Sequence, residues 1–346
     1  MQLKPITAIT VLLLVVISLS VAGCAVSPST PSPVPTLHLR SSWVQKSHVY
    51  EGGIHFHSNI SDGANTSEQI SAAYRAEGFN FTVLADHNVV TSNYVPAPGI
   101  MAISGEEITT CENGTKCAGL DEVHTLAIGI VQTIGTKSGS TVSQGNTQAV
   151  IDSIVSQGGL AALAHPARPN NTYTNPLGLQ NYTFVETQNS TNPRTPLTNA
   201  RAWQYYDDIL TNGKQVWALR DDDAHGITAV NRSATIVNAD QLTRADIMAN
   251  LKAGNYYVAT GFGSTGTRNM ARISSITTNN DTITIKVPQN STIQWIKSGG
   301  VIAKTTANVM TDFYTAQGNE GYVRIVVSRS DNPVAQAWSQ PIFFAL

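Results

Sequence analysis

The sequence predicts an α/β domain followed by a small antiparallel β-sandwich, in a chain of 346 residues. Two patterns predict this fold class. Up to about residue 270, short apolar runs typical of buried strands alternate with segments of helical periodicity, and such repetition favours parallel strands. Beyond that point, short alternating strands are separated by turn residues. A chain of this length can form two domains with a substantial core.

The first 24 residues are interpreted as a targeting segment. Lys4 supplies a positive start, and residues 8–21 form an apolar stretch shorter than a membrane span of about 20 residues. Residues 21–24, Val-Ala-Gly-Cys, resemble the cleavage box of bacterial lipoproteins, in which Cys24 carries the lipid. An ordinary secretory signal with a chance cysteine is the alternative. Residues 25–36, rich in Ser, Thr and Pro, are interpreted as an extended tether.

Four segments between the targeting region and residue 270 have helical character. They lie at residues 66–78, 148–157, 199–212 and 244–253. The first begins with a capping box at Thr66, and the last two end at Gly213 and Gly254. The strands of the C-terminal part are expected at residues 282–287, 293–295 and 322–327. Residues 170–199, rich in Asn and Thr, are interpreted either as a lid or as a solvated insertion.

Histidines and carboxylates recur at the ends of the apolar runs. The chain has eight histidines, and all but His38 and His48 fall at such positions. A His-x-His pair on a strand points both imidazoles to one face, because side chains alternate. Closing the strands into a barrel would gather these ends at one rim. Although a single such histidine is usually structural, the series indicates a multinuclear metal site and a hydrolase.

This series resembles the PHP family, named for polymerase and histidinol phosphatase. The family motifs are His-x-His, Asp-His, Gly-x-Glu, His-Pro and Asp-x-His, and all occur in order within residues 50–265. The resemblance implies a distorted TIM-like (β/α)7 barrel over residues 37–270, with residues 271–346 as an accessory β-sandwich. The exported organisation and the Gln-Pro-Ile-Phe string at 340–343 are similar to the carbaryl-hydrolase-like branch of the family.

The resemblance also implies three metal positions. The first is held by His55, His57, Glu107 and Asp223, the second by Glu107, His124 and His165, and the third by Asp62, His87 and His225. Glu107 bridges the first two, and it fits the Gly-x-Glu motif better than Glu106 does. Asp86 is either a ligand or a partner that orients an imidazole. Asp221 and Asp222 are expected outside the ligand set.

Such a donor set predicts two or three divalent ions. Nitrogen and oxygen ligands suit zinc, manganese or iron. Ions about 3.5 to 4 Å apart can share a bridging hydroxide, which is a nucleophile near neutral pH. Glu107 and Asp223 would therefore serve catalysis through the ions that they hold. Arg168 is a further catalytic candidate, since its guanidinium can bind a phosphate oxygen, and a loop salt bridge is the alternative.

The first functional hypothesis is a phosphoesterase that acts on small phosphate esters outside the cytoplasm. The same chemistry serves carboxylic esters and carbamates, and a non-catalytic metal-holding module is the third reading. The net charge of −2 provides no basic field for a nucleic-acid backbone, so no nucleic-acid partner is expected. We expect a protein anchored by the Cys24 lipid to the outer face of the cell membrane.

Two further cysteines, Cys111 and Cys117, lie in the hydrophilic insertion of residues 109–121. An exported compartment permits a disulfide between them. Thiolate ligation of a metal is the alternative, and the His and carboxylate set already looks complete without it. Charged residues make up only 13% of the chain, which suits a protein outside the cytoplasm.

Overall fold

The structure is a computed structural model that divides into residues 1–36 and 37–346. It describes residues 38–91, 94–111, 122–135, 142–143, 147–166, 173, 175–189, 196–261 and 269–345. The predicted leader, tether and lipidation site at Cys24 lie outside these ranges, as do Cys117, Arg168 and the side chain of Cys111. None of the helices in these ranges combines the length and the apolar character that a membrane crossing requires.

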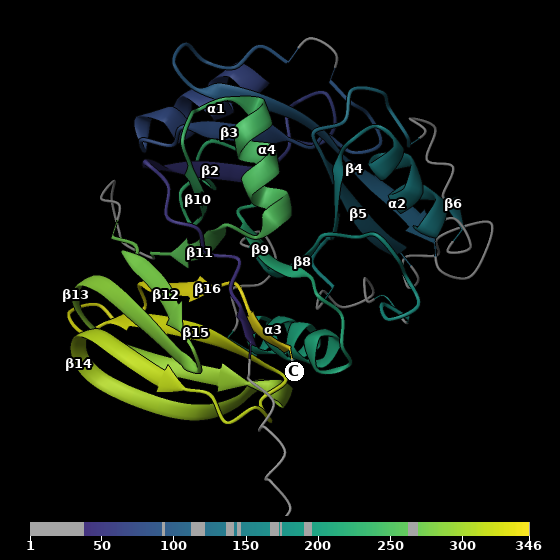
Figure 1. Cartoon of the computed structure of the whole chain (residues 1–346). Helices are drawn as coiled ribbons and strands as arrows, with labels where there is room; N and C mark the ends of the chain where they lie inside the picture. The colour runs from purple at the N-terminus through teal and green to yellow at the C-terminus, as the bar shows by residue number, and fades with distance from the viewer. Residues whose placement is uncertain are drawn as a thin grey trace, which may run out of the picture. The chain divides into compact units, whose positions relative to one another are not determined.

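The elements up to residue 260 are strands with helices interspersed among them (Figure 1). They are β1 (His38–Arg40), β2 (His48–Phe56), α1 (Ser67–Ala76), β3 (Phe81–Leu84), β4 (Met101–Cys111), β5 (Glu122–Ile128), β6 (Val142–Ser143), α2 (Thr147–Ser156), β7 (Leu160–Leu163), β8 (Phe184–Asn189), α3 (Pro196–Thr211), β9 (Trp217–Asp221), β10 (Ser233–Ala239), α4 (Arg244–Ala253) and β11 (Tyr256–Thr260). The helices α1–α4 coincide closely with the segments that the sequence predicts.

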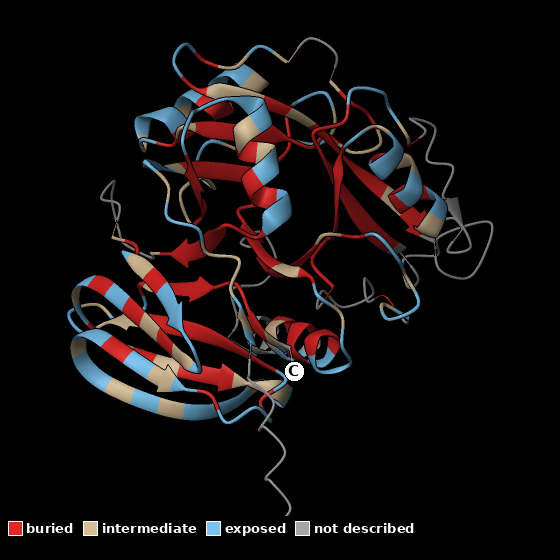
Figure 2. Cartoon of the chain, in the orientation of Figure 1, coloured by how far each residue is buried: buried red, intermediate tan, exposed pale blue. Residues whose placement is uncertain are grey.

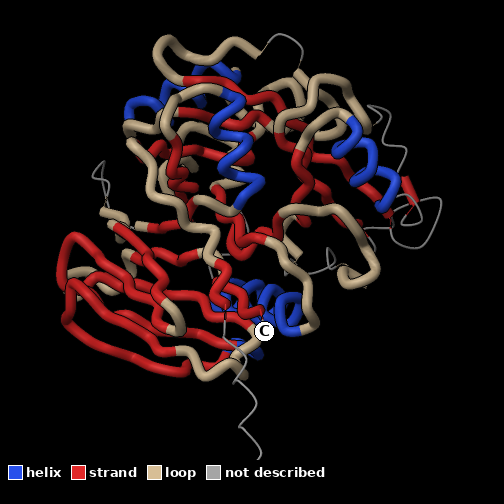
Figure 3. The backbone as a smooth tube through the Cα atoms, in the orientation of Figure 1, coloured by secondary structure: helices blue, strands red, loops and turns tan. Residues whose placement is uncertain are grey.

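The C-terminal part consists of strands joined by turns and one short 3-10 helix. They are β12 (Ser275–Asn279), β13 (Thr282–Lys297), η2 (Ser298–Gly300), β14 (Val301–Thr315), β15 (Tyr322–Arg329), β16 (Gln336–Ser339) and β17 (Ile342–Ala345). Figure 3 shows this contrast, with no α-helix drawn in the segment beyond α4. All their pairings are antiparallel, as expected. Because β16 also pairs with β11, these strands continue the hydrogen-bonded network of the first part.

Pairwise hydrogen bonding places the strands around the predicted metal site in the order β10-β2-β3-β4-β5-β7-β8-β9. Pairing is parallel within β2-β3-β4 and within β7-β8-β9. The expectation of parallel strands is wrong for β5, which is antiparallel to β4 and β7, and for β10, which is antiparallel to β2. The sequence has no helical pattern between β4 and β5, and a strand pair joined without a crossover helix pairs antiparallel.

A closed (β/α)7 TIM-like barrel is not confirmed. Within the described ranges, β9 has no ladder with β10 or β2, and only an isolated bridge joins Phe56 to Ala224. Two backbone hydrogen bonds flank this bridge, from His57 N to Ala224 O and from Ala224 N to His55 O. The chain is a mixed α/β protein in which the ends of β2 and β9 meet beside the predicted ligands.

The strands of this array are buried, and α1 packs on them through a close approach to β2 (Figure 2). A capping box at Thr66 begins α1, whose Ile70 and Tyr74 are buried. A Cβ atom on Gly53 would lie 2.4 Å from the Tyr74 ring. The absence of a side chain at Gly53 therefore allows α1 to pack closely on β2. This packing occurs next to His55 and His57, which follow Gly53 in the chain.

Candidate metal centre

Glu107, near the middle of β4, lies at the centre of a buried group of imidazoles. Its Oε2 is 3.2 Å from Nε2 of His55 and 3.2 Å from Nε2 of His57. Its Oε1 lies 2.8 Å from Nδ1 of His124 and 2.8 Å from Nε2 of His165. The two oxygens of one carboxylate therefore face two different pairs of histidines. A carboxylate in this position could contribute one oxygen to each of two metal ions.

The first group of donors is fully buried. It contains His55, His57, Glu107 and Asp223, whose ligand atoms all lie within 4.8 Å of one another. Oδ1 of Asp223 is 2.9 Å from Nε2 of His57 and 3.4 Å from Nε2 of His55. The structure brings together the four residues that the sequence predicts for the first metal position.

The second group surrounds the other side of the Glu107 carboxylate. His87, Glu107 and His124 offer donor atoms within 4.8 Å of one another, and His165 contacts Glu107 directly. The rings of His124 and His165 lie 5.0 Å apart at an angle of 70°. His87 was expected in the third position alone, but its Nδ1 is 3.3 Å from Oε2 of Glu107. His87 therefore shares donor groups both with Glu107 and His124 and with Asp62 and His225.

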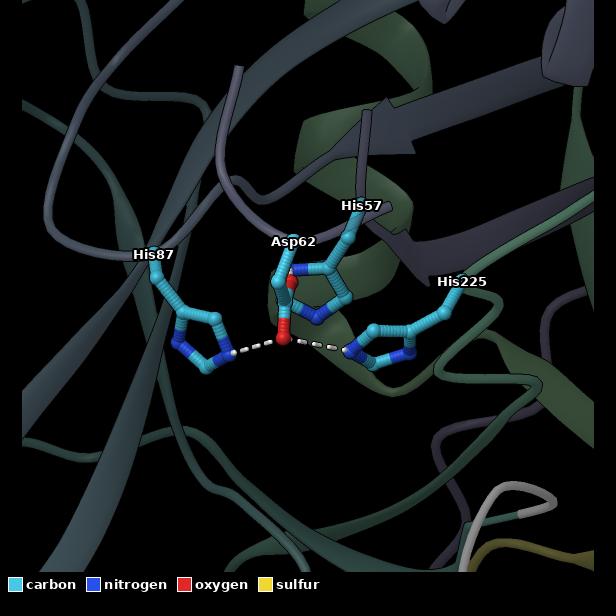
Figure 4. Close-up of side chains that lie close together, drawn as sticks. All are labelled: His57, Asp62, His87 and His225. Carbon is cyan, nitrogen blue, oxygen red and sulfur yellow. Dashed lines mark ion pairs between the residues drawn. The ribbon is translucent and has the colours of Figure 1, made fainter. Parts of the chain in front are cut away.

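The third group is the exposed one. Figure 4 shows an oxygen of Asp62 between the rings of His87 and His225, with His57 beside them. Oδ2 of Asp62 is 3.2 Å from Nε2 of His225 and 3.6 Å from Nε2 of His87. The Asp62 side chain is 53% exposed, whereas that of Glu107 is 1% exposed. A molecule from solvent would meet the third group before the other two.

The backbone at three predicted ligands has positive φ angles. They are 61° at His55, 27° at His165 and 45° at Asp223. A residue with a side chain held in this region costs on the order of 1–3 kcal/mol. The β2–β3 register also shifts between Gly53 and Phe56, so His55 and His57 do not lie on a regular strand. Both rings reach Glu107 because the chain turns at His55, and not through simple strand alternation.

The charged groups of the cluster shift one another's pKa values. Burial opposes protonation of His57, but Asp223 and Glu107 raise its pKa to about 9. Burial likewise opposes ionisation of Glu107, but the imidazoles of His55 and His124 hold its pKa well below the usual range. The hydrogen bond from His225 lowers the pKa of Asp62 to about 2. The cluster thus favours the protonated form of His57 beside ionised carboxylates, whereas burial lowers the pKa of His87.

The donor set fits divalent ions. Nε2 of His55 and Nδ1 atoms of His57 and His165 are buried, and none of them has a hydrogen-bond partner in the part of the chain that the structure describes. A buried polar atom without a partner costs about 1–3 kcal/mol. For Nε2 of His55, which faces Glu107 and Asp223, an ion would remove this cost. Zinc, manganese and iron all accept such nitrogen and oxygen ligands.

Neighbouring carboxylates have other roles. Glu106 accepts hydrogen bonds from the amides of Ile134 and Gly135, away from the cluster. Asp86 accepts from the backbone and hydroxyl of Ser58 and from the hydroxyl of Ser61. It therefore fixes the loop that carries Asp62.

Glu186 is a buried carboxylate at the cluster that the sequence reading did not single out. It lies on β8, and its Oε1 is 2.7 Å from Nδ1 of His55. The interpretation of residues 170–199 as a lid or insertion is wrong here, because β8 is a buried strand of the array. A signal existed in Phe184-Val185-Glu186, where two apolar residues precede a carboxylate, as Leu163 and Ala164 precede His165. Asp221, expected outside the ligand set, forms a group with His55 and Glu186.

Asp222 is a buried carboxylate that accepts hydrogen bonds from Tyr74 on α1 and from the backbone of Arg232 and Ser233. Burial raises its pKa to about 7, while hydrogen bonds from the Ser233 amide, the Tyr74 hydroxyl and the Arg232 amide oppose the rise. Because its folded pKa lies above the unfolded value, the folded protein binds more protons between about pH 4 and 7. Asp222 therefore makes the fold less stable as the pH rises through that window.

Replacing Tyr74 with Phe removes one donor to Asp222 and should raise the pKa of Asp222 further. We expect Tyr74→Phe to lower the free energy of unfolding by about 1 to 2 kcal/mol at pH 8, where the carboxylate is ionised, and by less at pH 5.5. Urea titrations of metal-stripped protein at both pH values measure the difference. An equal loss at the two pH values would show that the hydroxyl does not act through the Asp222 charge.

Among known proteins, this chain is similar to several solved structures. No family model and no curated protein matches the chain. One similar structure is a two-domain protein of Bacteroides vulgatus that contains a predicted PHP-like metal-dependent phosphoesterase. The two sequences are 14% identical, the match covers 86% of this chain and 96% of that chain, and the TM-score is 0.46.

Two further similar structures share less of the chain. One is a putative metal-dependent phosphoesterase of Bifidobacterium adolescentis, with 17% identity, 51% of this chain and 87% of that chain covered, and a TM-score of 0.36. The other is a lesion-specific endonuclease of Pyrococcus furiosus, with 13% identity, 59% of this chain and 56% of that chain covered, and a TM-score of 0.41. At these similarities, the chemistry of this chain rests on its own cluster.

Proposed function

We propose that this protein is a metal-dependent hydrolase with a PHP-type centre, and that its substrates are small phosphate esters. The observation that carries the proposal is the contact of Glu107 with two pairs of histidines through its two oxygens. The structural carboxylates Asp86 and Asp207 accept from amides, hydroxyls and a guanidinium. Glu107 instead faces four imidazole nitrogens within 3.2 Å, and imidazole is a common metal ligand.

The residues have separate tasks in this proposal. His55, His57 and Asp223 would hold one ion beside Glu107, and His124 and His165 another. Asp62, His87 and His225 would hold a third at the exposed side. Bound ions of this kind would ionise a water molecule near neutral pH and stabilise negative charge on the group under attack. Glu107 would fix the spacing of the first two positions because it spans both.

Charge favours an anionic substrate. The three groups contain the carboxylates of Glu107, Asp223 and Asp62, and three divalent ions would exceed their charge. The surplus positive charge lies partly in a buried, low-dielectric site, where it attracts an anion more strongly than in water. A phosphate monoester dianion gains more from this surplus than a neutral carboxylic ester or carbamate does. The exposed position of Asp62 gives such a substrate access to the centre.

The test is a side-by-side assay of the chain from residue 37 to 346, the second compact unit. The protein is stripped of metal, reloaded separately with zinc, manganese or iron, and given an aryl phosphate, an aryl phosphodiester, an aryl acetate and an aryl carbamate. We expect preference for the phosphates. Preference for the acetate or carbamate would replace the proposal with a carboxylic ester or carbamate hydrolase. Metal binding without hydrolysis of any of the four would indicate a metal-holding module.

A further inference from the structure

Glu186 contacts one ligand residue from each of two predicted metal positions. It is 1% exposed, and its Oε1 lies 2.7 Å from Nδ1 of His55. Its Oε2 accepts a hydrogen bond of 2.8 Å from the backbone amide of His165. His55 belongs to the first group of donors and His165 to the second. The Glu186 carboxylate therefore links the two groups from the side opposite to Glu107.

The contact at His55 decides which ring nitrogen can bind a metal ion. A neutral imidazole has one N–H and one lone pair. When Nδ1 donates its proton to Glu186, the lone pair is on Nε2, the atom that faces Glu107 at 3.2 Å. A carboxylate behind a ligating histidine fixes both its tautomer and its ring orientation.

The contact at His165 acts on the backbone. His55 and His165 both have positive φ angles, of 61° and 27°. Such conformations persist only when surrounding contacts hold them. Glu186 binds the ring of the first residue and the amide of the second. One buried side chain thus contacts both of these residues with positive φ angles, at the ring of His55 and at the amide of His165.

Asn189 extends the same contact to Asp223. Its side-chain amide lies 3.4 Å from Oε2 of Glu186 and donates to Oδ2 of Asp223 at 2.9 Å. Both Asn189 and Glu186 lie on β8, a strand that contributes none of the nine predicted ligands. The role of β8 at this site is therefore to support ligands from neighbouring segments.

An ion held by His55, Glu186 and Asp221 is the competing explanation of these contacts, since their donor atoms lie within 4.8 Å of one another. Such an ion would need Nδ1 of His55, while the first metal position needs Nε2 of the same ring. A neutral imidazole cannot supply a lone pair on both nitrogens. The supporting role is the one compatible with Nε2 facing Glu107.

We propose that Glu186 is a positioning residue of the metal centre: it sets the tautomer of His55 and holds the backbone of His165, so that both groups of donors meet at Glu107. The inference rests on the proposed metal centre and not on the identity of the substrate. Removing the Glu186 charge should weaken metal binding without removing any predicted ligand.

The test compares the full chain with Glu186→Gln, which keeps the side-chain size. Metal-stripped proteins are titrated with Zn²⁺ against a chromophoric chelator, and the Co²⁺-loaded forms are compared by their visible absorption spectra. We expect zinc affinity to fall about 10- to 100-fold, with an altered Co²⁺ spectrum. The control is Glu320→Gln, because Glu320 is also buried and accepts amide hydrogen bonds from Gln317 and Gly318, outside the cluster.

Wild-type zinc affinity and an unchanged Co²⁺ spectrum in Glu186→Gln would overturn the proposal, as would a loss of affinity no larger than that of Glu320→Gln. Loss of one whole equivalent of zinc, with the remaining sites unaffected, would overturn it in favour of Glu186 as a ligand. If Glu186→Gln does not fold, Glu186→Asp decides, since it keeps the charge and withdraws the carboxylate by one methylene. A wild-type protein that binds zinc but hydrolyses no ester would refute the proposed function alone.

Discussion

Glu107→Ala is expected to abolish hydrolysis and to reduce the metal content of the purified protein. The substitution removes both oxygens of the carboxylate that faces His55 and His57 on one side and His124 and His165 on the other. Two of the three predicted positions lose a ligand in one step. We expect the rate to fall by at least about 100-fold, the scale at which losing one stabilising group in an active site is felt.

Glu106→Gln is the matched control for this experiment. Glu106 precedes Glu107 on β4 and is also buried, but its carboxylate accepts amide hydrogen bonds from Ile134 and Gly135. We expect it to lower stability and to leave the metal content intact, as measured by elemental analysis. If Glu107→Ala retained both the bound metal and the activity, the assignment of ligands would be wrong.

The grouping of the ligands was predictable because it depends on motifs and on strand ends. His55, Glu107 and Asp223 follow or occupy apolar runs, and neighbouring strands of a sheet bring such positions together. The choice of Glu107 over Glu106 needed only the Gly-x-Glu motif. Motifs and strand ends are local patterns, so they can be recognised from the sequence alone.

Other features depend on contacts that no local pattern displays. The ring of His55 is contacted by Glu186, which is far away in the sequence. Glu186 itself lies in a stretch whose Asn and Thr content suggested a loop. Four of the six residues of β8 are polar, and three of these four are buried, namely Glu186, Thr187 and Gln188. The antiparallel direction of β5 also depends on pairing with both neighbours. Burial of polar side chains follows from the assembled fold, so the polar composition of this stretch wrongly predicted a loop in place of β8.

The C-terminal strands share a buried ion pair with the first part of the chain. Asp207 on α3 accepts two hydrogen bonds from Arg324 on β15, of 2.8 Å and 2.7 Å, and one of 2.7 Å from the hydroxyl of Tyr322. The side chains of Asp207 and Arg324 are 4% and 5% exposed. The Arg324 guanidinium also lies over the Trp203 ring, 4.4 Å from its centroid. Residues 271–346 are therefore tied to α3 by buried polar contacts as well as by apolar packing.

Asp207→Ala is expected to lower the free energy of unfolding by about 3–5 kcal/mol, because it leaves the Arg324 charge buried without its partner. Chemical denaturation of the full chain measures the loss. Asp208→Ala is the matched control: Asp208 is the next residue of α3 and is exposed, so its removal should change stability by less than about 0.5 kcal/mol.

The same pair of variants shows whether a loss of stability at α3 affects metal binding. Asp207 is not among the donor groups of the metal centre, so folded Asp207→Ala should bind as much metal as the wild type at low temperature. Unfolding in two steps, with the C-terminal strands lost first, would show that α3 and β15 form a joint between separately folding parts. Unfolding in one weakened step would show that the C-terminal strands belong to the same cooperative unit as the array that carries Glu107. We expect the single step, because β16 pairs with β11 in one hydrogen-bonded network.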